Sequence, residues 1–333
     1  MENCEVIILS CFNTNPSSHY TIHPKVKLIS LQVPVYPSNP IKKIFWYLSL
    51  VKPLAAFLKL EKPDIIFAEG SYLCSTLSLV KNKALIKAGC EHIGFKSLNS
   101  LHKRLTKLLY PKLDLLIVLT KNDKTHYSKF LKNVIAIPNF IDKVTDSILD
   151  LRNKIIVSAG RLEQQKGFDM LIKAFAIVRE QHPDWSLVIH GEGIEREKLE
   201  SLCQTLHIER NVSLPGMSSN LPAEFNKASI FSMSSRFEGF PMVLIEAMAS
   251  GLPCISFNCS GPDEIINDGV NGLLVNEGDI KQFAEKIIFL IENPEKRMEL
   301  SKQAILKADK YTAPQVRTRW LEVLKDIHKF KNA

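Results

Sequence analysis

The sequence lacks the cysteine patterns that mark disulfide-bonded or zinc-binding folds. Seven cysteines occur among 333 residues, which is an odd number, and none of them forms a C-x-x-C pair. Most lie inside apolar runs, where reduced thiols are usually buried. The pattern therefore argues against a disulfide scaffold and favours a chain that stays in a reducing compartment.

The sequence also lacks a basic secretory start and an apolar run of bilayer length. Residues 1–5 carry two acids, so no export signal is indicated and we expect a cytoplasmic protein. The best membrane candidate, residues 44–60, is interrupted by Lys52 and Pro53, and we interpret it as a buried or interfacial helix. No internal repeat is evident, which argues against a solenoid.

Positive charge is concentrated in one stretch, from Lys81 to Lys132. That stretch holds twelve Lys or Arg against three acids, a net charge of +9, which leaves −1 for the rest of the chain. Such a field suits an anionic partner, namely a membrane surface or a lipid pyrophosphate. A solvated lysine-rich face is the alternative. Nucleic acid is disfavoured because the stretch matches no nucleic-acid-binding motif.

Short β-branched runs alternate with longer amphipathic stretches, which predicts parallel sheets covered by helices. We expect an α/β protein of two Rossmann-like, doubly wound domains facing a cleft. The first domain, residues 1–145, has predicted strands at 6–10, 26–31, 65–68, 115–119 and 134–137, and predicted helices at 41–60, 97–110 and 121–130. The polar segment 142–153 is the predicted hinge.

The second domain, residues 146–312, repeats the alternation. Its predicted strands are 155–159, 186–190, 212–214, 230–234, 254–257 and 272–275, and its predicted helices are 168–180, 195–206, 221–227 and 242–250. Residues 313–333 form a terminal helix that we expect to pack back on the first domain. Ligands of open α/β sheets bind beyond the carboxyl ends of the strands, so the loops there are the places to search.

One such loop, residues 160–167, lies between a predicted strand and a predicted helix and begins and ends with glycine. Arg161 can form bidentate hydrogen bonds to phosphate oxygens, Lys166 supplies a positive charge, and the start of the following helix adds backbone N–H groups that point at the anion. The loop is not a P-loop, because the G-x-x-x-x-G-K-[ST] order is absent. Two solvated cations are the alternative reading.

A second loop and helix occupy residues 235–251. Pro241 stands where a first helical residue is expected, and Gly251 stands where the helix should stop. Glu246 would lie about one turn inside the helix, and Glu238 lies in the loop ahead. The Glu246 carboxylate can accept hydrogen bonds from a vicinal diol such as that of ribose, and Glu238 can bind hydroxyls of a second sugar. An ordinary amphipathic helix with a solvated glutamate is the alternative.

These two segments, together with residues 191–193, 261–266 and 271–275, resemble the retaining group 1 (family 4 type) glycosyltransferases of the GT-B fold, which include bacterial exopolysaccharide and O-antigen enzymes. The resemblance covers most of residues 154–290, and the Glu-x7-Glu element is its specific signal. By resemblance, the donor diphosphate is bound by Arg161, Lys166, Gly239, Phe240, Pro241, Met242 and Val243. Glu246 is expected at the ribose, Gly191, Gly193 and Met217 near the nucleoside, and Glu238 at the transferred sugar.

In the first domain, His92 resembles the acceptor-side histidine that faces the donor sugar, which makes His92 and Glu238 the candidate catalytic residues. A lone surface histidine is the alternative. The segment 68–71 follows another strand, and Tyr110, Asp114 and Thr120 are interpreted as packing and caps. The first predicted strand looks like the family's second, and residues 11–19 contain no glycine. We therefore expect a shortened N-terminal domain.

The resemblance implies transfer of a hexose, with retention, from a UDP-sugar, or with less support a GDP-sugar, to a lipid-linked or saccharide acceptor of bacterial surface polysaccharide. The chain contains no Asp-x-Asp, so neither a metal nor another cofactor is expected. The basic stretch would hold the protein peripherally on the cytoplasmic face of the inner membrane. The alternatives are a UDP-sugar epimerase and a non-catalytic membrane-associated scaffold.

Overall fold

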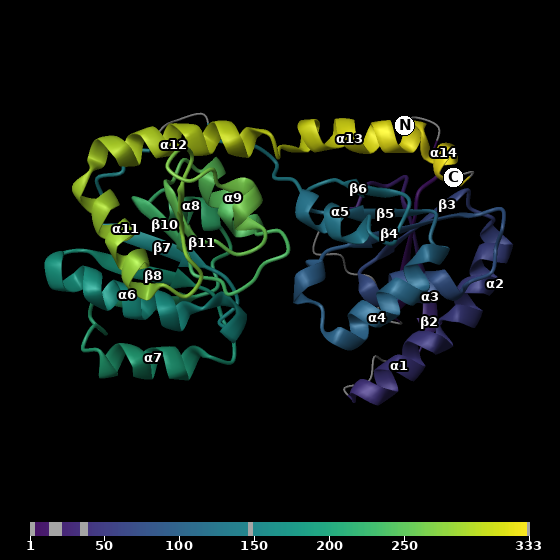
Figure 1. The fold of residues 1–333 in the computed structure, drawn as a ribbon, viewed down its shortest axis with the longest axis horizontal. Coiled ribbons are helices and arrows are strands. Elements are labelled where there is room, and N and C mark those ends of the chain that lie inside the picture. Colours follow the sequence, from purple (N-terminus) through teal and green to yellow (C-terminus); the bar gives the residue numbers. More distant parts are fainter. Residues whose placement is uncertain (1–3, 13–21, 34–38, 146–148, 332–333) are drawn as a thin grey trace.

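The computed structural model describes residues 4–12, 22–33, 39–145 and 149–331. Two α/β domains lie side by side, and the chain crosses between them near residue 141 and returns near residue 312 (Figure 1). The two crossing segments are hydrogen-bonded to each other, from Ile141 N to Tyr311 O and from Ala313 N to Ile141 O, both at 2.9 Å. No described helix is both long and apolar enough to span a bilayer.

The second domain contains a six-stranded parallel sheet with the order β12-β11-β10-β7-β8-β9. This is the Rossmann order 3-2-1-4-5-6 read from the opposite edge. The order reverses between β7 and β10, so a ligand is expected beyond the carboxyl ends of those two strands. The strands are β7 (Ile155–Ala159), β8 (Ser186–His190), β9 (Val212–Gly216), β10 (Ile230–Met233), β11 (Cys254–Phe257) and β12 (Leu273–Val275).

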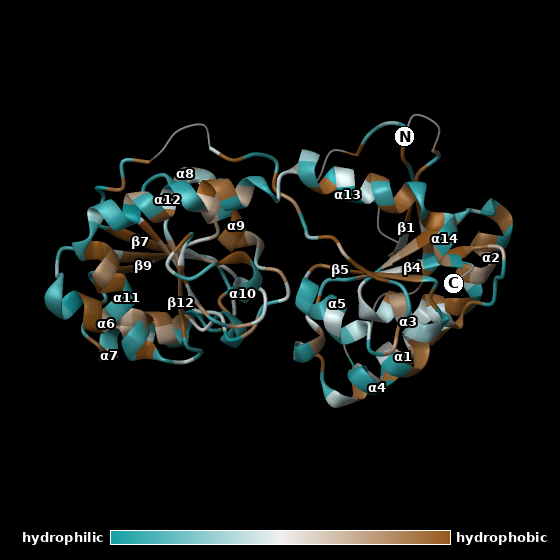
Figure 2. Cartoon of the chain, turned by 45° about the horizontal axis from the view of Figure 1, so that its top comes forward, coloured by the Kyte–Doolittle hydropathy of each residue, from teal (hydrophilic) through white to brown (hydrophobic). Residues whose placement is uncertain are grey.

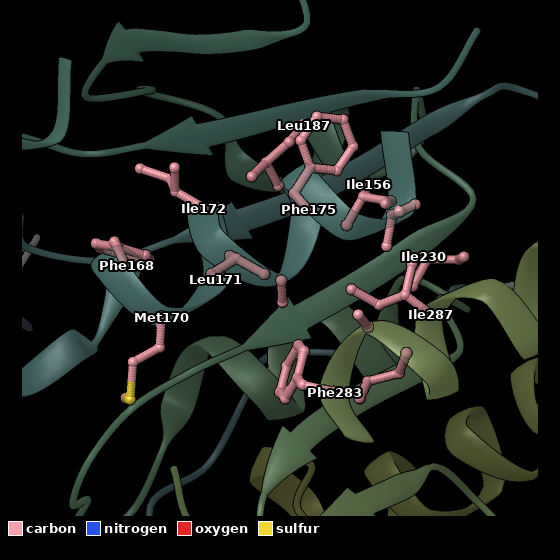
Figure 3. Packing of buried hydrophobic residues seen from close by; sticks show 14 of the residues in the cluster. Ile156, Phe168, Met170, Leu171, Ile172, Phe175, Leu187, Ile230, Phe283 and Ile287 are labelled. Carbon is pink, nitrogen blue, oxygen red and sulfur yellow. The ribbon is translucent and has the colours of Figure 1, made fainter. Parts of the chain in front are cut away.

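Helices cover both faces of this sheet because successive strand side chains point to opposite sides. One face packs on α6 (Phe168–Gln181) and α11 (Ile280–Glu292), as Figure 3 shows for Phe168, Leu171, Phe175, Phe283 and Ile287 around Ile156, Leu187 and Ile230. The other face packs on α9 (Met242–Ala249) and α12 (Pro294–Asp309). The remaining elements are α7 (Arg196–Thr205), α8 (Leu221–Phe225), α10 (Pro262–Ile265) and the 3-10 turn η3 (Gln164–Lys166).

The first domain holds a four-stranded parallel sheet in the order β3-β4-β5-β6 and a separate parallel pair, β1-β2. Within the described residues, the strands of this domain therefore form two separate sheets, whereas a Rossmann-like domain was expected to have one. The strands are β1 (Ile7–Phe12), β2 (Lys27–Val33), β3 (Ile65–Glu69), β4 (Ile86–Glu91), β5 (Leu115–Val118) and β6 (Val134–Ala136). Residues 13–19 of the glycine-free segment lie outside the described residues.

Helices of the first domain pack on one face of its sheet, and the chain's last helices cover the other. The first group is α2 (Val51–Glu61), α3 (Ser71–Leu79), α4 (Ser100–Leu109) and α5 (Lys121–Tyr127), with the 3-10 turns η1 (Phe95–Ser97) and η2 (Tyr110–Lys112). Helix α1 (Pro40–Ser49) packs instead against β2 and α3. On the other face, Val316 and Val323 of α13 (Ala313–Lys325) and Ile327 of α14 (Ile327–Lys331) pack against Ile86 and Ala88 of β4.

The expected elements differ from the structure at four points. The single helix 41–60 is divided at Leu50 into α1 and α2, since Pro53 in the first turn of α2 has no N–H to continue a preceding helix. Strand β4 and helix α3 were not predicted, because Gly89 and the serine-rich sequence of α3 weaken both periodicities. Pro241 is the cap before α9 rather than its first residue.

Candidate functional site

The loops after β7 and β10 meet at the point where the strand order reverses. Gly167 ends the first loop with φ of +63°, and a Cβ there would lie 2.1 Å from the carbonyl oxygen of Ser234. Only glycine permits both this left-handed conformation and this close approach. Ser234 Oγ donates to the Lys166 carbonyl at 3.0 Å, and Gln165 Nε2 donates to the Phe237 carbonyl at 3.0 Å. The two loops therefore form one structural unit.

The ammonium of Lys166 and the carboxylate of Glu238 are paired at the centre of this unit. Lys166 Nζ lies 2.7 Å from Glu238 Oε1, and the two side chains are only 17% and 7% exposed. The hydroxyl of Ser235 donates to the same oxygen at 2.6 Å. The structure thus joins a residue expected at the diphosphate to one expected at the transferred sugar, and adds Ser235 as a partner.

Arg161 and Arg236 have different surroundings. Arg161 is exposed and contacts Glu163 Oε1 at 2.9 Å, so its guanidinium lies at the rim of the site. Arg236 forms a two-point ion pair with Asp169 of α6 at 2.9 and 2.8 Å and donates to the Gln164 carbonyl at 2.6 Å. Sequence reasoning missed this bridge, since no spacing in the chain connects Asp169 with Arg236.

The loops expected to face a nucleoside lie beside the residue 160–162 turn. A Cβ on Gly191 would lie 1.8 Å from the Gly160 carbonyl oxygen, and one on Gly193 would lie 2.4 Å from that of Leu162. Met217 follows β9 and is 80% exposed. The structure therefore brings the two glycines against the loop 160–167, while the Met217 side chain is exposed to solvent after the end of β9.

Glu246 is half-buried in the first turns of α9. Burial raises the pKa of its carboxyl above the usual glutamate value. Within the described part of the chain, this carboxylate has no hydrogen-bond or ion-pair partner. A half-buried acceptor that lacks a partner can take the two hydroxyls of a vicinal diol.

The start of α9 presents its first amides toward the same region. The helix begins at Met242, directly after the cap residue Pro241, and the N–H groups of Met242 and Val243 precede its internal hydrogen bonds. Phe240 is held by an edge contact with Tyr311 at 5.7 Å between ring centroids, and Met242 and Val243 pack partly against the core. The positive end of α9 is therefore fixed in place next to Lys166, a geometry that suits an anion.

On the first-domain side, His92 follows β4 directly and is paired with Glu69 at the end of β3. His92 Nε2 lies 2.6 Å from Glu69 Oε2, and this hydrogen bond raises the pKa of His92. Both side chains are about half exposed. The pair lies at the carboxyl ends of adjacent strands, where ligands of open α/β sheets bind.

Behind His92, a buried hydrogen-bond network holds the end of β4. The Glu91 carboxylate accepts from the Tyr110 hydroxyl and from Ser71 Oγ. Burial raises the pKa of Glu91 to about 7. Thr120 caps α5, and Asp114 accepts from Lys87 N at 2.8 Å, which confirms Tyr110, Asp114 and Thr120 as packing and capping residues.

The carboxyl ends of both sheets meet at the domain boundary. A Cβ on Gly239 would lie 2.6 Å from the His92 carbonyl oxygen, so the candidate catalytic segments are in backbone contact. Beside this contact, the Glu264 carboxylate accepts from Lys121 N at 2.8 Å and from Asn122 N at 2.5 Å. The arrangement can hold an anion on α9 and present the group attached to it to His92.

Comparison with known proteins agrees with this geometry. Residues 142–307 match the family described as "Glycosyl transferases group 1". The chain is 32% identical to an uncharacterized glycosyltransferase of Haemophilus influenzae over 84% of this chain and 81% of that protein. It is 30% identical, over 86% of this chain and 82% of the relative, to a Campylobacter jejuni 4-alpha-N-acetylgalactosaminyltransferase named for a diphospho-undecaprenol-linked saccharide.

Among solved structures, the HepE protein of Anabaena in complex with UDP aligns with a TM-score of 0.76. The alignment covers 90% of this chain and 86% of HepE at 20% identity. At that identity the likeness concerns the fold.

Proposed function

Because this chain belongs to the group 1 glycosyltransferases, we propose that it transfers a hexose, with retention of anomeric configuration, from a UDP-sugar to a lipid-linked saccharide of a bacterial surface polysaccharide. The observation that carries the proposal is the cluster of Lys166, Glu238 and the α9 start at the strand-order reversal. The UDP complex of HepE and the lipid-linked substrate of the Campylobacter relative support the choice of donor and acceptor.

Donor binding changes the partner of Lys166. A diphosphate on the first amides of α9 offers more negative charge than one carboxylate, so it draws Lys166 Nζ away from Glu238, 2.7 Å distant. The Glu238 carboxylate then accepts from hydroxyls of the transferred sugar. Arg161 swings from Glu163 onto a phosphate oxygen, and Glu246 accepts from the ribose diol.

Transfer then requires an acceptor hydroxyl on the same face of the sugar as the diphosphate. As the bond from C1 to the diphosphate oxygen breaks, that oxygen takes the proton of the acceptor hydroxyl, whose oxygen bonds to C1. His92 lines this face from the first domain. The cations and the α9 amides stabilise the departing diphosphate, so the reaction needs no divalent metal.

The acceptor side is proposed to work at the cytoplasmic face of the inner membrane. The stretch from Lys81 to Lys132 carries nine net positive charges. Ten of its twelve cations are exposed, and Lys87 and Lys103 are partly buried. Such a field attracts anionic lipid headgroups and the pyrophosphate of a lipid-linked acceptor.

The donor site is tested by calorimetry with UDP and GDP on the wild type, Lys166→Ala and Glu246→Gln. We expect heat with UDP for the wild type and a weakening of roughly tenfold or more for Lys166→Ala, which removes a charge-assisted bond. Glu285→Gln, on the outer surface of α11, is the control and should bind as the wild type does. Turnover should survive EDTA. Wild-type turnover in both site variants, or a strict manganese requirement, contradicts the proposal.

A further inference from the structure

Helix α4 turns its leucines outward. Leu101, Leu105 and Leu108 are 57%, 38% and 69% exposed, and their spacing of four and three residues places them on one helical face. Thr106, which is buried, and Leu109, which is partly buried, lie on another side of the helix and pack against the domain core. The helix therefore presents a row of apolar side chains that no part of the described chain covers.

Helix α1 carries further exposed apolar side chains at the same end of the domain. Phe45 and Leu48 are 67% and 49% exposed. A chain of aromatic contacts joins the two helices, since Tyr47 of α1 stacks on Tyr72 at 4.4 Å and Tyr72 meets the His102 ring of α4 edge-on at 5.1 Å. Figures 1 and 2 both show α1 and α4 at the same end of the first domain. We call Phe45, Leu48, Leu101, Leu105 and Leu108 the α1–α4 face.

Cations surround the α4 part of this face. Arg104 and Lys107 lie on α4, Lys96 and Lys112 lie in the turns before and after it, and all four are exposed. The α4 sequence contains no acid. Leucines on one side with Lys and Arg beside them are typical of helices that lie in the plane of a membrane interface. An apolar protein partner would not require this charge.

We propose that the α1–α4 face docks on an anionic lipid bilayer, with its apolar side chains at the acyl boundary and the four cations at the headgroups. The inference rests on the proposed function, because it assigns to a defined surface the membrane at which a lipid-linked acceptor is met. It also accounts for the position of α4, which follows His92 in the chain through η1 and exposed Ile93. Docking would place the acceptor side of the site next to the lipid.

Vesicle flotation tests the docking surface. Wild-type protein should float with phosphatidylglycerol vesicles and much less with phosphatidylcholine vesicles. The triple variant Leu101→Ser, Leu105→Ser, Leu108→Ser should bind roughly tenfold or more weakly, because it removes buried apolar groups. Arg104→Gln with Lys107→Gln should lose roughly fivefold per cation. All five side chains are solvent-exposed, so thermal unfolding should stay as in the wild type.

The matched control is the triple variant Val270→Ser, Phe289→Ser, Leu306→Ser, which removes three apolar side chains, 51%, 41% and 61% exposed, from the second domain. It should float as the wild type does. Wild-type flotation by the α4 leucine variant, no preference for phosphatidylglycerol, or no flotation of the wild type would overturn the proposal. So would a wild-type dimer in light scattering that the leucine variant converts to a monomer.

Calorimetry with UDP on the same preparations separates this inference from the donor assignment. Normal flotation without UDP binding removes the donor assignment and supports the membrane face. UDP binding without flotation does the reverse.

Discussion

At the scale of single residues, the site is organised by charge pairs that span elements. Lys166 of η3 pairs with Glu238 of the loop after β10, and His92 after β4 pairs with Glu69 of β3. Each pair holds a side chain in a defined direction before any ligand arrives, which reduces the reorganisation needed at binding. Glu69 acts through His92 and is a positioning residue.

Replacing Glu69 by Gln should lower the pKa of His92 toward its ordinary value, because the carboxylate that favours the imidazolium is removed. In the wild type, the ion pair exists below the raised pKa of His92 and is lost as the pH rises through it. The variant has no such ion pair, and its His92 should lose the imidazolium proton at a lower pH. The imidazole proton signals of His92 in NMR report the change, and the limb of the kcat/KM profile that follows His92 should move in the same direction.

Glu285→Gln serves again as the control for that titration, since it removes a carboxylate far from His92. An unchanged titration of His92 in Glu69→Gln would show that the pair has no effect in solution. A loss in kcat of up to roughly 100-fold is compatible with misplacement alone.

At the scale of elements, close backbone contacts between loops assemble the proposed donor site. The loop 160–167 fits against the loop after β10 only because Gly167 has no Cβ, and the contact fixes Lys166 opposite Glu238. Much of the site's geometry therefore depends on which loops touch. Charged residues alone would not define it.

Gly167→Ala should destabilise the fold by about 1–3 kcal/mol from backbone strain and also weaken UDP binding. The φ of +63° is unfavourable for alanine, and the 2.1 Å approach to Ser234 O forces the two loops apart. Gly278→Ala is the matched control, because Gly278 has φ of +77° and open space around its Cβ. Thermal unfolding and UDP calorimetry measure both effects. Equal behaviour of the two variants would rule out the loop contact.

At the scale of the whole molecule, the domains touch at two places near the site and are joined at the crossing segments. Gly239 lies against the His92 carbonyl, and Glu264 accepts from the Lys121 and Asn122 amides. These contacts describe a closed arrangement, which excludes water from a reaction centre between the domains. Opening must break the Glu264 contacts, while the paired segments at Ile141 and Ala313 can remain intact.

Glu264→Gln should shift the free protein toward an open form, because the amide replaces one acceptor oxygen with a donor that faces backbone N–H groups. Hydrogen bonds to a charged group contribute about 1.5–3 kcal/mol each, enough to change the populations strongly. Small-angle X-ray scattering should show a larger radius of gyration. Asp263→Asn is the control, since Asp263 accepts from Gly261 within its own domain. The same radius in Glu264→Gln as in the wild type would exclude Glu264 as a latch.

The sequence predicted the second domain closely because its signals are local. Strands β7 and β8 are rich in β-branched residues, and Gly251 follows the end of α9 as expected. It missed β4, where Gly89 and Lys87 interrupt the apolar pattern, although Gly89 is required there because a Cβ would lie 2.9 Å from Cys74 Sγ. It also merged α1 and α2, although Pro53 lies in the first turn of α2, where the helix divides.

By itself, the sequence determined the fold class, the family resemblance and the residue types that can hold a diphosphate, because strand periodicity and short motifs are properties of neighbours in the chain. The tertiary structure decided which of those residues meet. The pairing of Lys166 with Glu238, the bridge from Arg236 to Asp169 and the contact of His92 with Gly239 join positions that are 67 to 147 residues apart. No local pattern encodes such pairs, since they follow from the order of strands in the sheets and the docking of the two domains.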